Sequence, residues 1–193
     1  MFIVLYGINN LGKSTQAKKL VERLNKEGYP AQYLKYPIYD IHPSGTMLNA
    51  YLRQGNPFNL SAREGQTIYA LNRTQYEETL KQFLAKGIHI VAEDYTGTGI
   101  AWGIGAGVDK PYLETINAHL LQEDLAFLFD GERFTEATEQ GHKHETNDAL
   151  MTVVREAHKQ LAQERGWLPI DANQSIDSIH EHLWQIVNTQ IRQ

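Results

Sequence analysis

The segment of residues 7–15 carries the strongest chemical signal in the chain. It fits the pattern G-x-x-x-x-G-K-[ST] of loops that bind phosphate groups. Glycines let such a backbone curl so that successive N–H groups converge on phosphate oxygens. Lys13 is expected to reach the β- and γ-phosphates of a nucleotide, and Ser14 is expected to hold Mg²⁺. The nucleotide-binding residues predicted in this loop are Gly7, Asn9, Asn10, Leu11, Gly12, Lys13, Ser14 and Thr15.

The elements on either side of the loop supply the context that a chance match to the pattern lacks. Phe2–Tyr6 is continuously apolar, as expected of a strand buried on both faces of a parallel sheet. After the loop, apolar residues recur at helical spacing and predict a helix packed on that sheet. These residues are Ala17, Leu20, Val21 and Leu24. The alternative is a strand, turn and helix that carry Gly, Lys and Ser by chance, and the context favours the phosphate loop.

The rest of the chain alternates short apolar runs with longer amphipathic stretches. Further strands are predicted at residues 31–36, 88–92, 125–129 and 167–170, and helices at 45–54, 60–86 and 176–191. Strands separated by helices form βαβ units, which build a parallel sheet with helices on both faces. We therefore predict an α/β protein: a three-layer α/β/α sandwich with a five-stranded parallel sheet and the P-loop NTPase fold, in one domain over residues 1–193.

Ligands of such sheets bind beyond the carboxyl ends of the strands. Those ends are predicted at Gly7, Pro37, Glu93, Asp130 and Asp171. Phosphate-loop proteins keep a carboxylate near Mg²⁺, and Glu93 ends the third apolar run. We expect Ser14 and Glu93 to hold the metal, and an acidic residue of a surface turn is the alternative for Glu93.

Composition narrows the class of protein. The 193 residues carry 18 basic and 23 acidic side chains, a net charge of −5, and no basic block, which argues against nucleic acid as a partner. The absence of cysteine excludes disulfides, thiol catalysis and thiolate metal sites. The apolar start of the chain is too short for a signal peptide or a membrane span. We therefore expect a cytoplasmic protein without a membrane partner.

A second cluster of polar and aromatic side chains lies on the longest predicted helix. Its members, spaced so that they share one helix face, are Tyr69, Asn72, Arg73 and Tyr76. An arginine beside an aromatic ring on such a face suits a planar ligand with hydrogen-bonding groups. The alternative is that the tyrosines belong to the core and Arg73 extends to solvent. With the phosphate loop nearby, the ligand interpretation is favoured.

Short motifs in a recurring order connect these residues to a known family. The loop continues Gly-Lys-Ser-Thr-Gln, and residues 69–73 match an aromatic-x-x-Asn-Arg motif. Further segments of the same series are the basic–aromatic–Pro segment 35–37, Glu-Asp-Tyr at 93–95, residues 98–102, residues 141–145 and Asp-Ala-Asn at 171–173. In the order and spacing of these motifs, the chain resembles the thymidylate kinases over nearly its whole length.

The resemblance implies an ATP-dependent, Mg²⁺-dependent kinase that phosphorylates a nucleoside monophosphate, with dTMP as the expected acceptor. It implies that ATP contacts the phosphate loop and also Asp171 and Ala172, where the family receives adenine. Lys13 and Glu93 are then catalytic, together with Lys143 and Arg133 of a lid over residues of about 132–146. The implied acceptor-binding residues are Lys35, Tyr36, Tyr69, Arg73, Tyr95, Thr98, Gly99 and Trp102. Members of the family are commonly homodimers, so the resemblance implies a homodimer here.

Several positions depart from the family pattern, and most of these changes remove positive charge from the phosphate path. Asp94 replaces the arginine of the family's Asp-Arg-Tyr motif, and Asn9 replaces an acidic residue of its phosphate loop. Residues 142–145 read His-Lys-His-Glu, where the family's lid has Asp/Glu-Arg-x-Glu. Two alternatives to a dTMP kinase therefore stay open: a kinase for another nucleotide or a deoxynucleoside, and a nucleotide-binding relative that does not catalyse.

Overall fold

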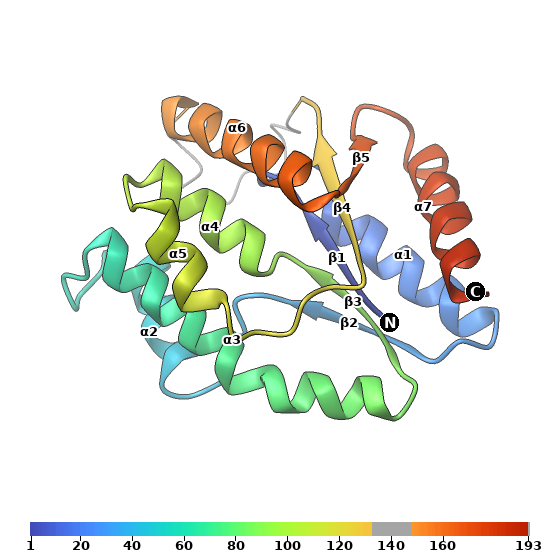
Figure 1. Cartoon of the computed structure of the whole chain (residues 1–193), viewed down its shortest axis with the longest axis horizontal. Coiled ribbons are helices and arrows are strands. Elements are labelled where there is room, and N and C mark those ends of the chain that lie inside the picture. Colours follow the sequence, from blue (N-terminus) through green and yellow to red (C-terminus); the bar gives the residue numbers. More distant parts are fainter. Residues whose placement is uncertain (133–147, 193) are drawn as a thin grey trace.

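Five parallel strands form the centre of the molecule (Figure 1). The computed structural model describes residues 1–132 and 148–192. The strands lie in the order β2-β3-β1-β4-β5, so the first strand of the chain lies in the middle of the sheet. Their bounds are β1 (Phe2–Tyr6), β2 (Ala31–Lys35), β3 (His89–Glu93), β4 (Leu125–Asp130) and β5 (Leu168–Asp171). The prediction of a five-stranded parallel sheet is confirmed.

Helices cover both faces of this sheet and complete the three predicted layers (Figure 1). One face carries α1 (Lys13–Lys26) and α7 (Ile176–Ile191), which contact each other. The opposite face carries α3 (Ala62–Ala85), α4 (Thr96–Gly105) and α6 (Asp148–Arg165). Two shorter helices extend this layer: α2 (Ser44–Arg53) packs on α3, and α5 (Lys110–Asn117) packs on α4. Within residues 1–132 and 148–192, no helix has the length and apolarity of a membrane span.

The strand register brings the residues predicted to do chemistry to one edge of the sheet. Glu93 pairs with Leu5 of β1 on one side and with Lys35 of β2 on the other. Asp130, the last residue of β4, pairs with Asp171 of β5. Because all five strands run in the same direction, the phosphate loop leaves β1 at this same edge. The sheet therefore fixes the spacing between the loop and the carboxylates.

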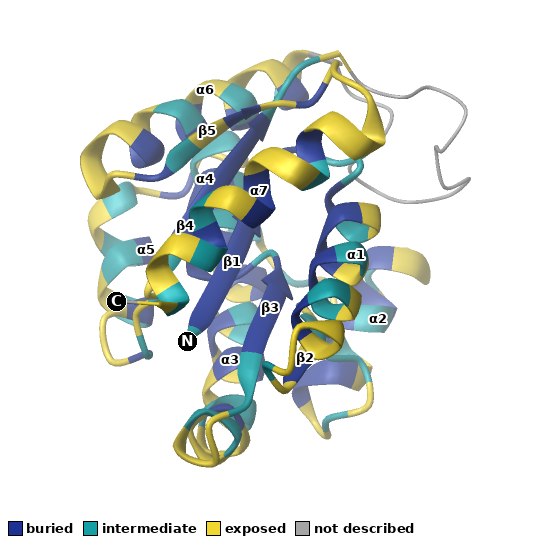
Figure 2. Cartoon of the chain, turned by 90° about the vertical axis from the view of Figure 1, so that its right-hand side faces the viewer, coloured by how far each residue is buried: buried dark blue, intermediate teal, exposed yellow. Residues whose placement is uncertain are grey.

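The central strand is also the centre of the core (Figure 2). Every residue of β1 is fully buried. The ring of Tyr6 stacks on Trp167 with 3.9 Å between ring centroids, and Phe2 meets the edge of Tyr95 at 5.0 Å. Each large apolar side chain that is fully removed from water contributes about 1.5–3 kcal/mol. This packing gives the phosphate loop a rigid strand to leave from.

The sequence patterns do not predict α4 and α5. Most of the stretch of small residues at 98–107 belongs to α4. Its glycines lie against large side chains: a Cβ on Gly97 would meet Trp167 at 2.3 Å, and one on Gly103 would meet Leu113 at 2.5 Å. Glycine disfavours a helix by about 1 kcal/mol per residue. The helical conformation of α4 is therefore stabilised by close packing and is not favoured by the helix propensity of its residues.

One buried histidine on α6 is not part of the predicted site. His158 is 1% exposed, and its Nδ1 donates a hydrogen bond to the Val154 carbonyl at 2.9 Å. Its Nε2 has no hydrogen-bond partner among the described residues. Burial lowers the pKa of His158 to about 4. The ring is therefore neutral in the folded protein at neutral pH.

We expect His158 to make the protein less stable as the pH falls. Below about pH 6.5 the unfolded chain binds a proton at this ring that the folded chain excludes until about pH 4. The unfolding free energy should therefore fall by about 2 kcal/mol between pH 7 and pH 5 through this residue alone. Urea unfolding of the wild type and of His158→Gln at both pH values isolates the effect. Equal losses in the two proteins would contradict this assignment.

Candidate active site

A cavity of about 750 Å³ opens at the carboxyl edge of the sheet, next to the phosphate loop. Its walls come from the phosphate loop, the segment after β2, and helices α2, α3, α4 and α7. Lys13 and Ser14 follow β1, the middle strand of the sheet. They therefore lie between the residues that follow β2 and β3 and those that follow β5, which form two ends of different character. One end is lined by aromatic residues and Arg73, and the other by residues of the segment from β5 to α7. This arrangement has room for ligands on both sides of the loop.

The phosphate loop has the backbone conformation that its glycines predict. Gly12 caps α1 with φ 79°, and Asn10 also has a left-handed φ of 64°. Gly7 has φ 134°, and a Cβ there would lie 2.5 Å from the Phe129 carbonyl oxygen of β4. A side chain at position 7 would therefore push the loop away from the sheet.

Lys13 is the buried cation of the loop. It is 3% exposed, and its Nζ donates hydrogen bonds to the carbonyls of Gly7 at 2.9 Å and Ile8 at 2.8 Å. The loop thus curls around its own lysine. These neutral carbonyl contacts can be exchanged for phosphate oxygens, which bind an ammonium group more strongly because they carry charge.

Glu93, the last residue of β3, contacts several polar side chains. Its carboxylate accepts hydrogen bonds from the Ser14 hydroxyl at 2.6 Å and the Tyr33 hydroxyl at 2.7 Å, and it pairs with Lys35 Nζ at 3.1 Å. Burial by itself raises the pKa of Glu93, but Lys13, Lys35 and the two hydroxyls hold it below its usual range. Glu93 is therefore ionised at neutral pH. An ionised carboxylate beside a hydroxyl is an oxygen donor set that suits Mg²⁺.

Asp94 follows Glu93 and brings a second carboxylate into the cavity wall. It has a left-handed φ of 63°, and its side chain is 16% exposed. Its carboxylate accepts a hydrogen bond from Thr98 Oγ1 at 2.9 Å and lies 3.9 Å from Lys13 Nζ. Burial raises the pKa of Asp94, and the charge of Glu93 raises it further. The carboxyl group that replaces the family's arginine at this position thus lies beside the phosphate loop.

Arg73 is held inside the cavity wall, so the alternative in which it extends to solvent is wrong. It is 3% exposed, and its Nε donates to Asn117 Oδ1 at 3.1 Å. Nη1 donates to the Tyr95 carbonyl at 3.4 Å, whereas Nη2 has no partner among the residues that the structure describes. A Cβ on Gly99 would lie 2.8 Å from Nη2. Gly99 therefore makes the space that the guanidinium group occupies.

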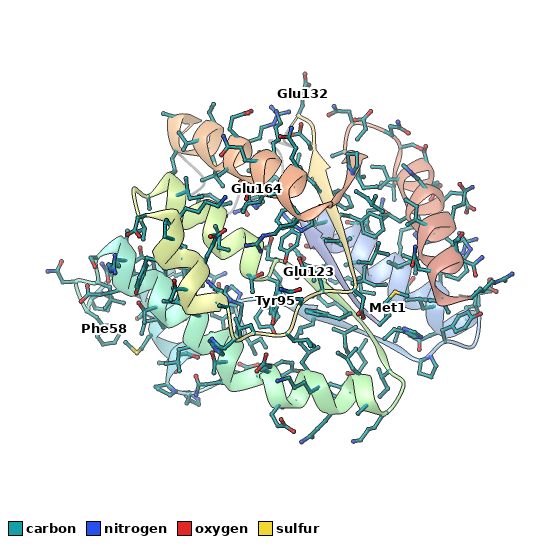
Figure 3. All side chains as sticks on the ribbon, in the orientation of Figure 1. Met1, Phe58, Tyr95, Glu123, Glu132 and Glu164 are labelled. Carbon is teal, nitrogen blue, oxygen red and sulfur yellow. The ribbon has the colours of Figure 1, made fainter. Side chains whose placement is uncertain are left out.

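Two tyrosine hydroxyls at this end are also buried and unpaired. Tyr36 and Tyr95 lie 5.2 Å apart by ring centroids, and neither hydroxyl has a hydrogen-bond partner within the described ranges. Tyr95 lies at the centre of the molecule (Figure 3). Burial raises the pKa of both hydroxyls, which keeps them neutral donors. Buried donors without partners are rare in native proteins. Three such groups at one end of a cavity indicate a ligand with several acceptor atoms.

The structure brings most of the predicted site residues together. All eight implied acceptor-binding residues line the cavity, as do residues 9–15, Ala172 and Glu93. Gly7 packs against Phe129 of β4 at the start of the loop. The exposed Asp171 accepts a hydrogen bond from the Asn173 N–H at 3.0 Å. Neither of these two is in the cavity lining. Arg133, Lys143 and most of the predicted lid at 132–146 lie outside the described residues.

Several cavity residues are missing from the sequence prediction. Tyr39, Tyr51 and Arg53 come from α2 and the segment before it, and the Arg53 guanidinium lies 4.6 Å from the centre of the Tyr39 ring. Asn72 explains why this segment reaches the cavity. Its amide bonds the N–H and the carbonyl of Ile38, each at 2.8 Å. That contact spans 34 residues of sequence, and no local pattern encodes it.

A parallel sheet of this strand order, with a phosphate loop beside a cavity, is typical of proteins that bind nucleotide phosphates. A sequence model of the thymidylate kinase family matches residues 5–183. The chain belongs to the thymidylate kinase family and is a nucleoside monophosphate kinase.

Individual relatives agree with this assignment. A thymidylate kinase of Halothermothrix orenii is 30% identical over 97% of this chain and 96% of its own length. The human thymidylate kinase is 27% identical over 98% of this chain and 91% of its own length. A solved structure of the Candida albicans thymidylate kinase has a TM-score of 0.80, with 22% identity over 98% of this chain and 91% of that one. This last comparison supports the fold.

The contact between Gly99 and Arg73 can be tested through acceptor binding. Gly99→Ala puts a methyl group where the guanidinium lies, so we expect the KM for dTMP to rise by about tenfold. Gly105→Ala is the matched control on the same helix, because its Cβ would meet Val154 at 2.5 Å instead. The control should lower the melting temperature and leave this KM unchanged. An unchanged KM in Gly99→Ala would refute the contact's role.

Proposed function

We propose that this chain transfers the γ-phosphoryl group of ATP to dTMP and releases ADP and dTDP, and that the cavity residues carry the roles given below. The observation that carries the proposal is the position of the phosphate loop between two ends of one cavity. Phosphoryl transfer needs two nucleotides that approach each other end to end, with positive charge at the point where they meet.

The aromatic end has the groups that a pyrimidine monophosphate needs. Arg73 offers a buried guanidinium with one free edge, which suits a carbonyl oxygen of a pyrimidine. Tyr69 lies one helix turn before Arg73 on α3 and lines the same end, where its ring can stack on a planar base. Tyr36, Tyr95 and Trp102 surround the space between the base and the phosphate loop.

The transfer itself depends on charge and position, because little covalent chemistry is asked of the protein. Lys13 releases its carbonyl contacts and binds the transferring phosphoryl group, which draws negative charge from it. The N–H groups of the loop hold the remaining phosphates of the donor. Tight packing of the loop on β4 keeps these donors in place before the nucleotide arrives.

Ser14 and Glu93 are the residues proposed to hold Mg²⁺, since both present oxygen atoms at the phosphate loop. When bound there, the metal would neutralise negative charge on the phosphate groups of the nucleotide. Membership of the family supports two further parts of the proposal, a homodimer and a cytoplasmic location.

The proposed function is tested by a phosphoryl-transfer assay with Mg²⁺ and ATP, in which each nucleoside monophosphate and thymidine are offered separately. We expect dTDP from dTMP as the main product. Lys13→Ala should lose at least about 100-fold of this activity while its circular dichroism spectrum stays unchanged, because the fold does not depend on the lysine head group. If product forms only from another acceptor, that compound is the substrate and dTMP is not. Near-normal turnover in the variant would contradict the role of Lys13.

We expect the charge of Asp94 to weaken binding of the acceptor. Its carboxylate lies beside Lys13, on the path of two phosphate groups. One negative charge at about 7 Å from another costs on the order of 0.6 kcal/mol in water and more in a partly buried site. Asp94→Asn keeps the shape and an acceptor for Thr98, so the KM for dTMP should fall by about threefold. A rise in KM would show that the carboxylate is needed for binding.

A further inference from the structure

Gln16 is a buried amide on α1, three residues beyond Lys13. It is 2% exposed, and its Nε2 donates a hydrogen bond to the carbonyl of Ile176 at 2.8 Å. Ile176 is the first residue of α7, so this bond ties the phosphate-loop helix to the start of the last helix. The side-chain oxygen Oε1 has no hydrogen-bond partner in the part of the chain that the structure describes.

The orientation of this amide is fixed by its neighbour. A backbone carbonyl only accepts hydrogen bonds, so the NH₂ group must face Ile176 and the oxygen must face away from it. Rotating the amide by half a turn would place two oxygen atoms against each other. A buried amide oxygen without a donor is costly and uncommon in native proteins. The described residues therefore leave Oε1 without a hydrogen-bond donor, and a ligand can supply one.

The surroundings of Gln16 indicate what that donor is. Gln16 lines the end of the cavity opposite to Arg73, together with Ala172, Ile176 and Ile179. These small and apolar side chains suit the flat faces of a purine ring. ATP, the proposed phosphate donor, carries one exocyclic amino group on its base, at position 6. A 6-oxo purine has an acceptor at that atom, which would face Oε1 with like polarity.

We propose that Gln16 determines the choice of phosphate donor, with its Oε1 accepting a hydrogen bond from the 6-amino group of adenine. This inference rests on the proposed function, in which the end near α7 receives ATP. The bond from Nε2 to Ile176 positions Oε1 for that contact. Gln16 thus acts on the base, at a distance from the transferring phosphoryl group.

A second glutamine at the same end of the cavity supplies a matched control. Gln174 also lines the cavity, but its Oε1 already accepts a hydrogen bond from the Ser178 hydroxyl at 2.8 Å. Its amide therefore has no unmet acceptor. Methionine is unbranched and close to glutamine in size, and it lacks the amide oxygen, so the same substitution suits both positions.

The experiment compares ATP with purine riboside 5′-triphosphate, which is ATP without the 6-amino group. The ratio of kcat/KM for the two donors, at saturating dTMP, is measured in the wild type, Gln16→Met and Gln174→Met. We expect the wild type and Gln174→Met to prefer ATP by about tenfold, the range of one buried hydrogen bond, and Gln16→Met to lose most of this preference. Calorimetric Kd values for both donors should show the same pattern without turnover.

The outcomes separate this inference from the proposed function. If no protein variant forms dTDP with either donor, the proposed function fails. If transfer occurs and Gln16→Met lowers kcat/KM for both donors equally, Gln16 only anchors α7 and the inference is overturned. Equal use of the two donors by the wild type overturns it as well, even if Gln16→Met does not fold.

Discussion

The burial of one positive charge organises the site. Lys13 is almost fully enclosed, and an ammonium group in such a place is costly unless oxygen atoms surround it. Here the oxygens are the carbonyls of Gly7 and Ile8 and, at a longer distance, the Asp94 carboxylate. The loop can enclose its lysine because β1, from which it leaves, is buried at every position. Without that rigid strand, the charge would have no fixed set of partners to exchange for phosphate.

The parallel sheet positions the rest of the site around Lys13. Because β3 lies next to β1, Glu93 ends beside the loop and receives the Ser14 hydroxyl. Because β5 lies on the other side of β4, the segment leading to α7 reaches the opposite end of the cavity. The loop is thereby flanked by an end built from α2, α3 and α4 and an end built from α1 and α7. The two nucleotides of a kinase reaction need such a division.

The sequence predicts the parts of this arrangement that depend on local pattern. Buried strands such as Phe2–Tyr6 and the phosphate loop have strong signatures, and they suffice for the fold class. The family motifs add residues such as Tyr69 and Trp102, which line the cavity. α4 escapes prediction because its glycines disfavour a helix locally and are compatible with one only through close packing against Trp167 and Leu113.

Contacts between distant segments are the other part that the sequence does not reveal. Gln16 lies in a recognised motif, yet its bond to Ile176 spans 160 residues, and its unpaired oxygen is visible only in three dimensions. The same holds for Arg53, whose stacking on Tyr39 depends on how α2 packs. Residue types and spacing thus indicate which chemistry is present, and tertiary packing decides which atoms are left to bind a ligand.

In the proposed reaction, donor and acceptor occupy the two ends of one cavity and meet at Lys13. The most direct test is inhibition by a two-headed ligand, adenosine and thymidine joined through their 5′ oxygens by a chain of five phosphates. We expect inhibition that is competitive against both ATP and dTMP, with a Kd at least about tenfold below that of either nucleotide alone. Competition against only one of the two substrates would contradict it.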